Sequence, residues 1–263
     1  MRDHGGTKNT ETREGHGEVQ DGRRKPPGFT VVSLNLRGVH DRWLKREPLV
    51  VSGLAALNPD IICLQEAVTW CLQARWLAWR LSRRTGRHYH VAQSAKRGYR
   101  GILEGLAVIS AFPLDSKRRL ALGDQGRIAQ RARASIDSAS LVVANAHLDH
   151  RGTGSENRVV QAKRIARWLD GASPTVLCGD LNDRPESAAL EVLTANFRSA
   201  HVEHGFEVKG TAPAWESGRV IDYILVSSGV EVVAAGTCLD QPVRGTWPSD
   251  HFGLWAKLSL PET

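Results

Sequence analysis

The chain has 263 residues, of which 41% are hydrophobic and 24% charged, and its formal net charge is +7. This composition is that of a globular protein with enough apolar residues for a full core. No apolar run reaches the ~18 residues that a membrane-spanning helix needs, and no apolar signal segment follows the N-terminal charges. We therefore expect a cytoplasmic protein without an integral membrane segment. The positive charge suits a polyanionic partner, although a solvated basic face explains it equally well.

The chain divides into a polar beginning and one folded domain. Residues 1–27 are rich in glycine and charge, show no periodicity and end in Pro26-Pro27, which predicts a disordered leader. The folded domain is expected over residues 28–263, because no later segment has the composition of a linker and no repeat of fixed period occurs.

Within this domain, apolar strand patterns alternate with helical ones. The helix predicted at residues 69–84 carries Trp70, Trp76 and Trp79 at helical spacing, which predicts that their rings belong to the core. Helices are predicted at residues 49–57, 69–84 and 156–169, and strands at 29–34, 60–64, 106–109, 131–136, 141–146, 176–178, 221–226, 230–234 and 252–258.

This order of elements predicts an α/β (α+β) fold. Strands this apolar have to be buried on both faces, and a pair of packed sheets covered by outer helices achieves that burial. Cys63 and Cys178 lie inside apolar strand patterns, and neither Cys71 nor Cys238 completes a Cys-x-x-Cys spacing. Reduced thiols are therefore expected in place of a disulfide framework or a zinc site.

Polar residues that carry chemistry follow the predicted strands. Each one stands at the end of an apolar run, so we expect it at a strand end, where loops gather on a rigid scaffold. Strand ends that meet at one rim would bring together the groups needed to hold a divalent metal and cut a phosphate ester. The residues are Asn35, Glu66, His147, Asp180, Asn182, Asp222, Asp250 and His251.

The acids among them predict a metal. Glu66, Asp180 and Asp250 are isolated acids and not members of surface charge runs. Carboxylates that converge without a cation repel and raise one another's pKa, and bound Mg²⁺ or Mn²⁺ relieves that repulsion. The chain lacks the His-x-x-x-His or paired-cysteine spacing that zinc favours. A cap or turn role explains any one of these acids alone, but it explains the whole set poorly.

Two histidines have settings suited to the same chemistry. His147 ends a strand-like run and His251 follows Asp250 directly, so both can donate hydrogen bonds to phosphoryl oxygens as charge builds there. Asp222 is suited to orient one imidazolium. Six further histidines lack such settings and are expected at the surface or in loops: His40, His88, His90, His150, His201 and His204.

Together these segments resemble the endonuclease/exonuclease/phosphatase superfamily, which includes pancreatic-type deoxyribonucleases, apurinic-site endonucleases, neutral sphingomyelinases and inositol-polyphosphate 5-phosphatases. The resemblance runs from residues 31–35 to residues 248–252, nearly the whole chain after the leader. Its most specific parts are residues 179–185 and 249–251. It implies a four-layered α/β/β/α sandwich of two packed mixed sheets flanked by helices, in agreement with the strand patterns.

The resemblance also implies which residues hold the metal and the water. Asn35, Glu66 and Asp250 would surround Mg²⁺ or Mn²⁺. Asp180 would position or deprotonate the attacking water, and Asn182 would help to orient the water and the phosphate. Attack would then be in line, without a covalent enzyme intermediate.

The histidines receive their roles from the same resemblance. His251 would stabilise the phosphorane-like transition state with support from Asp222, and His147 would contact the phosphate from the other side. Two departures from the family pattern are the alanine at position 146, where the family commonly has threonine, and the missing arginine after Ser110.

The substrate does not follow from the fold, because this fold hosts very different phosphoesters. The basic composition favours a nuclease that acts on DNA or RNA as a monomer. The alternatives are a phosphatase or phospholipase-type phosphodiesterase on a small or lipid phosphoester, and a catalytically inactive binding module of the same fold. Residues 180–184 resemble the first inositol 5-phosphatase motif, but the second motif of that group is missing.

One arginine is a candidate for contacting substrate phosphate. Arg131 lies in a predicted strand and faces the same way as Arg133. Either side chain can reach a phosphate group if that face borders the site. The alternative is an exposed strand face with no contact to substrate.

Overall fold

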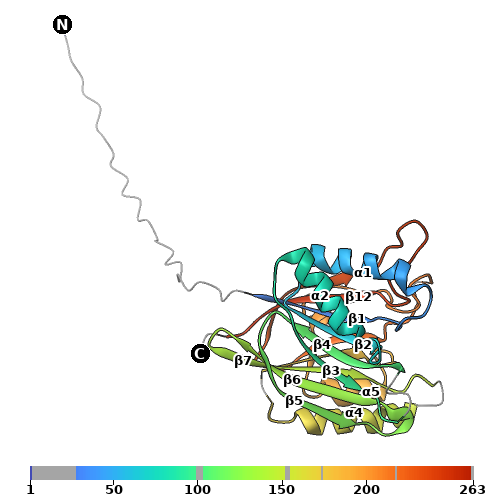
Figure 1. Ribbon diagram of the computed structural model, residues 1–263. Helices are drawn as coiled ribbons and strands as arrows, with labels where there is room; N and C mark the ends of the chain where they lie inside the picture. Colours follow the sequence, from blue (N-terminus) through green and yellow to red (C-terminus); the bar gives the residue numbers. More distant parts are fainter. Residues whose placement is uncertain (2–27, 99–102, 152–154, 173, 217, 262–263) are drawn as a thin grey trace.

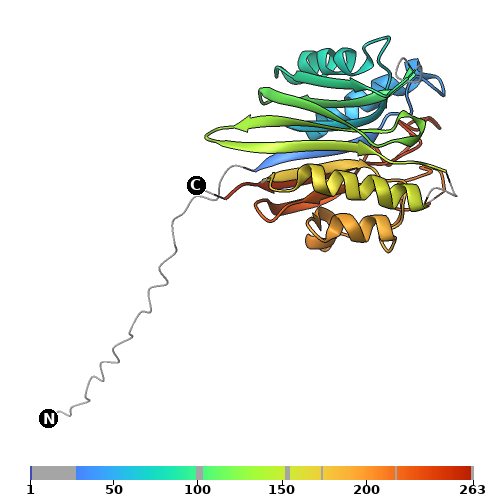
Figure 2. The same cartoon turned by 90° about the horizontal axis from the view of Figure 1, so that it is seen from below.

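Two β-sheets pack face to face, and helices lie on the outer face of each (Figures 1 and 2). The computed structural model describes residue 1 and residues 28–261, apart from residues 99–102, 152–154, 173 and 217. The predicted leader thus lies, except for its first residue, outside the described residues. Within the described ranges, no helix is both long and apolar enough to cross a bilayer.

Each sheet contains six strands in mixed orientation. The first sheet runs in spatial order through β11 (Glu231–Cys238), β12 (Gly253–Ser259), β1 (Phe29–Asn35), β2 (Ile61–Ala67), β4 (Gly105–Ser110) and β3 (His90–Ala95). The second runs through β5 (Leu114–Ala121), β6 (Ile128–Ile136), β7 (Ala139–His147), β8 (Thr175–Asp180), β10 (Asp222–Val226) and β9 (Arg198–Ser199).

The helices complete the four layers. Helices α1 (Trp43–Leu57) and α2 (Gln73–Thr85) cover the first sheet, and α4 (Ser155–Leu169) and α5 (Ala188–Thr194) cover the second. The short helix α6 (Ala200–Glu203) and the 3₁₀ turn η1 (Asp124–Gly126) lie between strands along the chain. The predicted sandwich of two mixed sheets with flanking helices is confirmed.

Successive side chains of the central strands point to opposite faces of the sheet, and both faces are buried, so these strands are apolar on both faces. Cys63 of β2 is buried in the core between the sheets, whereas Ile62 and Leu64 pack with α1 and α2. In the second sheet, Cys178 of β8 belongs to the same inter-sheet core and Leu177 packs with α4 and α5. Both cysteines are free and buried, as predicted.

The tryptophans in and just before α2 overturn one expectation. Trp70, Trp76 and Trp79 are 63%, 46% and 51% exposed and do not belong to the core. The stripe that faces the sheet consists of smaller aliphatic side chains, among them Leu77 and Leu81. Both stripes have helical spacing, so the sequence pattern alone could not show which one is buried.

Other differences concern interrupted or polar segments. Helix α1 begins at Trp43, ahead of the predicted start at residue 49, and contains Pro48. The sequence pattern does not predict strands β3 and β5, because neither shows an alternation of apolar and polar residues. The centre of β5 is exposed, as suits a strand at the edge of a sheet.

The strand directions bring the polar strand ends to one edge of the sandwich. β1 runs parallel to β2, and β7 runs parallel to β8 with His147 opposite Asp180. β10 is antiparallel to β8, which places Asp222 opposite the same Asp180. β12 is antiparallel to β1, so His251, just before β12, returns to the edge where Asn35 ends β1.

A buried polar link joins the two sheets beneath this edge. Gln65 Nε2 donates a hydrogen bond to Asn145 Oδ1 at 2.8 Å. Asn145 Nδ2 donates to the carbonyl oxygens of Leu64 at 2.9 Å and Ala107 at 3.0 Å. Because buried polar groups need partners, these bonds fix β7 of one sheet against β2 and β4 of the other.

We expect the Asn145→Ala variant to lose about 3 kcal/mol of its free energy of unfolding, because three buried polar groups each lose a hydrogen bond. Urea-induced unfolding measures the loss. The control Asn196→Ala changes an exposed amide and should stay within about 0.5 kcal/mol of wild type. An Asn145→Ala variant as stable as this control would contradict a role for the link in sheet registration.

Candidate active site

The predicted polar residues gather at one pocket of about 400 Å³. Asn35 and Asp222 are buried behind its wall, where they hydrogen-bond to Asp180 and His251. The other predicted residues at the strand ends line the pocket itself: Glu66, His147, Asp180, Asn182, Asp250 and His251.

Asp180 is the carboxylate on which most of these contacts converge. Its Oδ2 accepts a hydrogen bond from Asn35 Nδ2 at 3.0 Å, and its Oδ1 accepts one from the backbone N–H of Asn182 at 3.0 Å. Burial, together with the negative charge of Asp222, raises the pKa of Asp180 to about 7. The carboxyl group is therefore fixed in position and able to exchange a proton near neutral pH.

His251 and Asp222 form a buried ion pair. His251 Nδ1 donates to Asp222 Oδ2 at 2.8 Å, and its Nε2 lies 3.9 Å from Asp180 Oδ2. Burial by itself lowers the pKa of His251, but the charge and the hydrogen bond of Asp222, with the charge of Asp180, outweigh burial and raise it to about 10. His251 is therefore an imidazolium at neutral pH.

His147 has the opposite protonation. Burial, and then the positive charges of Arg127 and Lys96, lower its pKa well below the ordinary value, so the imidazole is neutral. Its Nε2 lies 3.4 Å from Asp180 Oδ2, while its buried Nδ1 has no hydrogen-bond partner in the described part of the chain. One neutral and one charged imidazole thus border the same carboxylate.

Backbone irregularities direct Glu66 into the pocket. The pairing of β2 with β4 shifts between Leu64 and Ala67, and Glu66 has a left-handed backbone with φ of 53°. Bulges redirect side chains, and such conformations cluster at functional sites. Burial, and then the negative charges of Glu104 and Asp250, raise the pKa of Glu66.

Asp250 is tied to the end of β1. Its Oδ2 accepts a short hydrogen bond from the guanidinium of Arg37, whose backbone N–H donates to Asn35 Oδ1 at 2.9 Å. Ser249 Oγ donates to the carbonyl oxygen of Asn35 at 2.6 Å. These bonds hold the segment before β12 against β1 and so position both Asp250 and His251.

Arg127 is a functional candidate that the sequence did not single out. It is 3% exposed, and its Nη2 contacts His150 Nδ1 at 2.7 Å. Its Nε and Nη1 are buried and have no partner among the described residues. A buried guanidinium with unused donors is costly unless an anion completes its contacts. Its place directly before the apolar run of β6 is the signal that could have found it.

Further lining residues were also missed. His150 is exposed in a loop, as expected, but it also lines the pocket beside Arg127. His201, also expected at the surface, is buried and its Nε2 lies 3.1 Å from the carbonyl oxygen of Gly236. Other residues that line the pocket without a clear sequence signal are Arg37, Glu104, Trp215 and Arg219.

Arg131 does not reach this pocket. Its Nη1 donates to the carbonyl oxygen of Trp168 at 2.7 Å, and its guanidinium lies 4.6 Å from the centroid of that ring. It lines a separate hollow together with Arg133, so the two do share a face of β6. That face is turned toward α4, so Arg131 does not line this pocket, and its contact with another part of the substrate stays a prediction.

Comparison with known proteins identifies the family. Residues 32–251 match the Endonuclease/Exonuclease/phosphatase family. The chain belongs to this family. It is 31% identical over 215 residues to "Protein angel" of Drosophila melanogaster, covering 71% of this chain and 60% of that protein. It is 26% identical over 200 residues to "Carbon catabolite repressor protein 4 homolog 3" of Arabidopsis thaliana, covering 64% and 43%. The chain spans about half the length of these relatives.

The solved structures agree on the fold. An endonuclease/exonuclease/phosphatase family protein from Bacteroides thetaiotaomicron superimposes with a TM-score of 0.77 at 19% identity, covering 91% of this chain and 100% of that chain. The two-sheet sandwich described above is therefore the fold of this family.

The side chains of this endonuclease/exonuclease/phosphatase family member fit a hard divalent cation. The pKa of Glu66, raised by burial and by neighbouring carboxylates, indicates a place that a cation would stabilise. Oxygen donors from carboxylates suit Mg²⁺ and Mn²⁺. In the part of the chain that the structure describes, two groups have ligand atoms within 4.8 Å of one another: Glu66, Glu104 and His147, and Asp180, Asp222 and His251.

The two groups differ in what holds them together. In the second group, the protonated ring of His251 offers no lone pair to a metal while it is paired with Asp222. In the first group, Glu104 is paired with Lys96, whereas the carboxylate of Glu66 has no ion pair within the described ranges. We therefore keep Glu66, with Asn35 and Asp250, as the predicted metal ligands, and Glu104 as an additional candidate.

Replacing Asp222 by Asn should lower the pKa of His251 from about 10 to below about 8, because burial would then act against a weaker opposing charge. An NMR titration of the His251 ring in metal-free protein measures this change. The control Asp137→Asn removes an exposed acid and should leave the titration unchanged. A wild-type His251 that titrates near its ordinary value of 6.5 would refute the ion pair.

Glu66→Gln should weaken Mn²⁺ binding at least about tenfold, because it removes a carboxylate charge from the predicted ligand set. Isothermal titration calorimetry with Mn²⁺ measures the affinity. Glu191→Gln, an exposed acid on α5, serves as the matched control and should bind Mn²⁺ as wild type does. Equal affinities for Glu66→Gln and wild type would place the metal elsewhere.

Proposed function

We propose that this chain hydrolyses phosphodiester bonds of DNA or RNA by direct attack of water, with Mg²⁺ or Mn²⁺ bound. The observation that carries the proposal is the meeting of three groups at one pocket: the proton acceptor Asp180, the imidazolium of His251 and the unpaired donors of Arg127. Phosphoester hydrolysis needs a base, a group that neutralises developing charge and a binding site for the phosphate anion.

Asp180 takes the proton of the attacking water. Its pKa of about 7 suits that task, and the hydrogen bonds from Asn35 and Asn182 hold both of its oxygens in place. The water oxygen forms a bond to phosphorus opposite the leaving oxygen, whose bond to phosphorus breaks. The leaving oxygen receives a proton from solvent.

The histidines meet the charge that builds on the phosphate. His251 donates from Nε2 to a non-bridging oxygen, while Asp222 keeps the ring charged and oriented. His147, which is neutral, donates to the phosphate from the other side. Asn182, whose Nδ2 donates to the carbonyl oxygen of Leu148 at 3.2 Å, orients the water through its amide oxygen.

A divalent cation held by Glu66, Asn35 and Asp250 would supply positive charge to the phosphate and leaving oxygens. Arg127 adds its unused donors to the same phosphate, and Arg37 keeps Asp250 in place through its ion pair. The chain's own side chains thereby bind the anion, orient the water and accept its proton.

The basic lining favours a nucleic-acid substrate. Arg37, Arg127 and Arg219 line the pocket together with Trp215, a combination that suits phosphates and bases. The formal net charge of +7 also attracts a polyanion. A small or lipid phosphoester and a catalytically inactive module are the competing readings, and the test below separates them.

Asp180→Asn should reduce phosphodiester cleavage at least about 10³-fold, because it removes the base while keeping the shape of the side chain. Nicking of supercoiled plasmid and shortening of a single-stranded RNA oligonucleotide, each with Mg²⁺ or EDTA, measure the activity. The control Asp170→Asn changes an exposed acid on the helical side of the second sheet and should cleave as wild type does.

The same cleavage assay, extended to a phosphomonoester and a phospholipid, decides the substrate class. Folded wild-type protein that cleaves a phosphomonoester or a phospholipid headgroup but neither plasmid nor RNA would replace the nuclease by the small-substrate reading. Folded protein that cleaves nothing but binds Mn²⁺ would leave an inactive module.

A further inference from the structure

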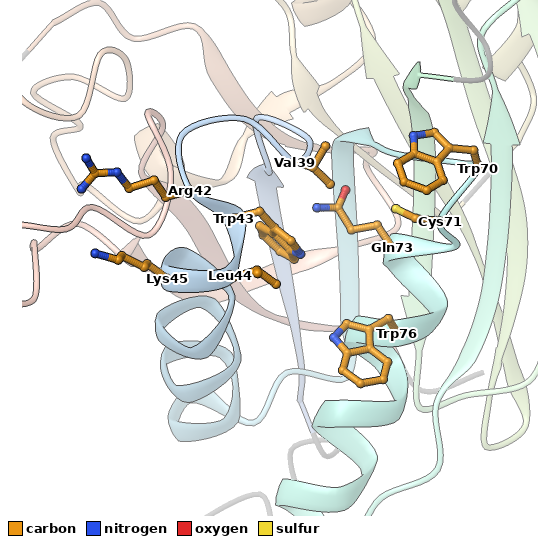
Figure 3. Close-up of a pocket in the computed structure, with 9 residues that line it drawn as sticks. All are labelled: Val39, Arg42, Trp43, Leu44, Lys45, Trp70, Cys71, Gln73 and Trp76. Carbon is orange, nitrogen blue, oxygen red and sulfur yellow. The ribbon is translucent and has the colours of Figure 1, made fainter.

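A hollow of about 620 Å³ lies between the beginnings of α1 and α2. In Figure 3, the rings of Trp43, Trp70 and Trp76 surround it, and Arg42 and Lys45 extend on the other side of the first turn of α1. We call these five residues the aromatic–basic surface. Trp70 and Trp76 are about half exposed or more, although tryptophan is normally well buried.

The walls of this hollow are held in place by Gln73. Its Nε2 donates to the carbonyl oxygen of Gly38 at 2.9 Å, and its Oε1 accepts from the backbone N–H of Val68 at 2.9 Å. Gln73 therefore ties the loop after β1 to the loop after β2. The hollow is preformed, so a ligand pays little ordering cost on binding.

The charges beside the hollow are the reverse of what the two helices need. Neither α1 nor α2 has an acidic residue in its first turn or a side-chain hydrogen bond at its N-cap. Arg42, Lys45 and Arg75 stand there instead, although the positive end of a helix dipole disfavours cations. An external anion would offset this arrangement, because cations and helix N-termini then act together.

The aromatic–basic surface is continuous with the candidate active site. Arg42 also lines a second hollow with Arg37, Trp215 and Trp247. Arg37 and Trp215, with Asp250, in turn line the catalytic pocket. Three hollows thus share walls from the catalytic pocket to α2, and tryptophan and arginine side chains occur in each.

Further along α2, aromatic and basic side chains continue outward. The rings of Trp76 and Trp79 lie 4.9 Å apart, with Arg80 5.8 Å from the first and Arg83 5.8 Å from the second. The acids near this path, Asp41, Asp250 and Glu47, are paired with Arg37 and Arg80. Arg42, Lys45 and Arg83 have no ion pair among the described residues and supply the positive charge. The path therefore presents a positive face with flat rings.

We propose that the aromatic–basic surface binds the single-stranded part of a polynucleotide whose scissile phosphate lies in the catalytic pocket. This inference rests on the proposed function and adds where the rest of the substrate lies. Rings that line hollows suit stacked bases, and Arg42 and Lys45, which extend on the other side of the first turn of α1, suit phosphates further along the strand. An anionic membrane fits less well, because the rings border a concave space connected to the catalytic pocket.

The test measures binding separately from cleavage. In an Asp180→Asn background with EDTA, fluorescein-labelled 20-nucleotide oligo(dT) and oligo(U) are titrated by fluorescence anisotropy. Trp70→Ala combined with Trp76→Ala should weaken binding at least about 20-fold, through loss of stacking. Val202→Ala, an exposed apolar side chain on α6, is the control and should bind as the background protein does.

The salt dependence of binding measures the contribution of the basic side chains to oligonucleotide affinity. Arg42→Ala combined with Lys45→Ala should reduce the slope of log affinity against log salt by about 1.4, as expected for two lost single-strand phosphate contacts. An unchanged salt slope together with unchanged oligonucleotide affinity in the tryptophan double variant overturns the proposal. Far-UV circular dichroism establishes that each variant is folded.

A cleavage assay and a vesicle-binding assay distinguish the remaining outcomes. With Asp180 intact, the tryptophan double variant should lose at least about tenfold more kcat/KM on a 20-nucleotide substrate than on a dinucleotide. If no polynucleotide is cleaved yet the oligonucleotide binding still depends on the tryptophans, the proposed function fails and the surface stands. If vesicles with 30% phosphatidylserine, but not oligonucleotides, lose affinity in the double variant, the surface is a membrane site and the proposal falls.

Discussion

The hydrogen bond from Asn35 Nδ2 to Asp180 Oδ2 joins the ends of two strands that belong to different sheets. The candidate site depends on it, because each sheet supplies only half of the chemistry. Glu66 and Asp250 come from the edge of the first sheet, and Asp180 comes from the second. The link between Gln65 and Asn145 lies beneath and keeps the sheets in the register that this contact requires.

This convergence has an electrostatic cost that the fold balances internally. Asp180 and Glu66 have raised pKa values because they are buried near other acids. The imidazolium of His251 offsets part of this repulsion. Because folding raises the pKa of His251, its contribution to stability is fully present below about pH 6.5 and is lost as pH rises through about 10. A bound cation would offset the repulsion that remains at Glu66.

The sequence was informative where a polar residue follows an apolar strand. Asn35, His147 and Asp180 carry that signature, and the strand directions together with the packing of the two sheets bring them to one edge. The direction of the Glu66 side chain depends on a bulge and a left-handed backbone, which no residue pattern predicts. The fold class followed from strands that are apolar on both faces.

Other features could not be predicted, for physical reasons. Arg127 looks like one more surface arginine until its burial is known. The tryptophans of α2 share their spacing with its aliphatic stripe, and only the packing of Leu77 and Leu81 shows which stripe faces the sheet. Arg131 has the right residue type but lies on a strand face covered by α4, where Trp168 holds it.

The proposed mechanism depends on a single in-line attack of water on phosphorus, with Asp180 as the base. The most direct measurement is the stereochemical course of hydrolysis of a dinucleotide phosphorothioate of known configuration, in ¹⁸O-labelled water with Mn²⁺. Inversion of configuration at phosphorus is the predicted result, because one displacement takes place without a covalent enzyme intermediate. Retention would require two displacements and would contradict the mechanism.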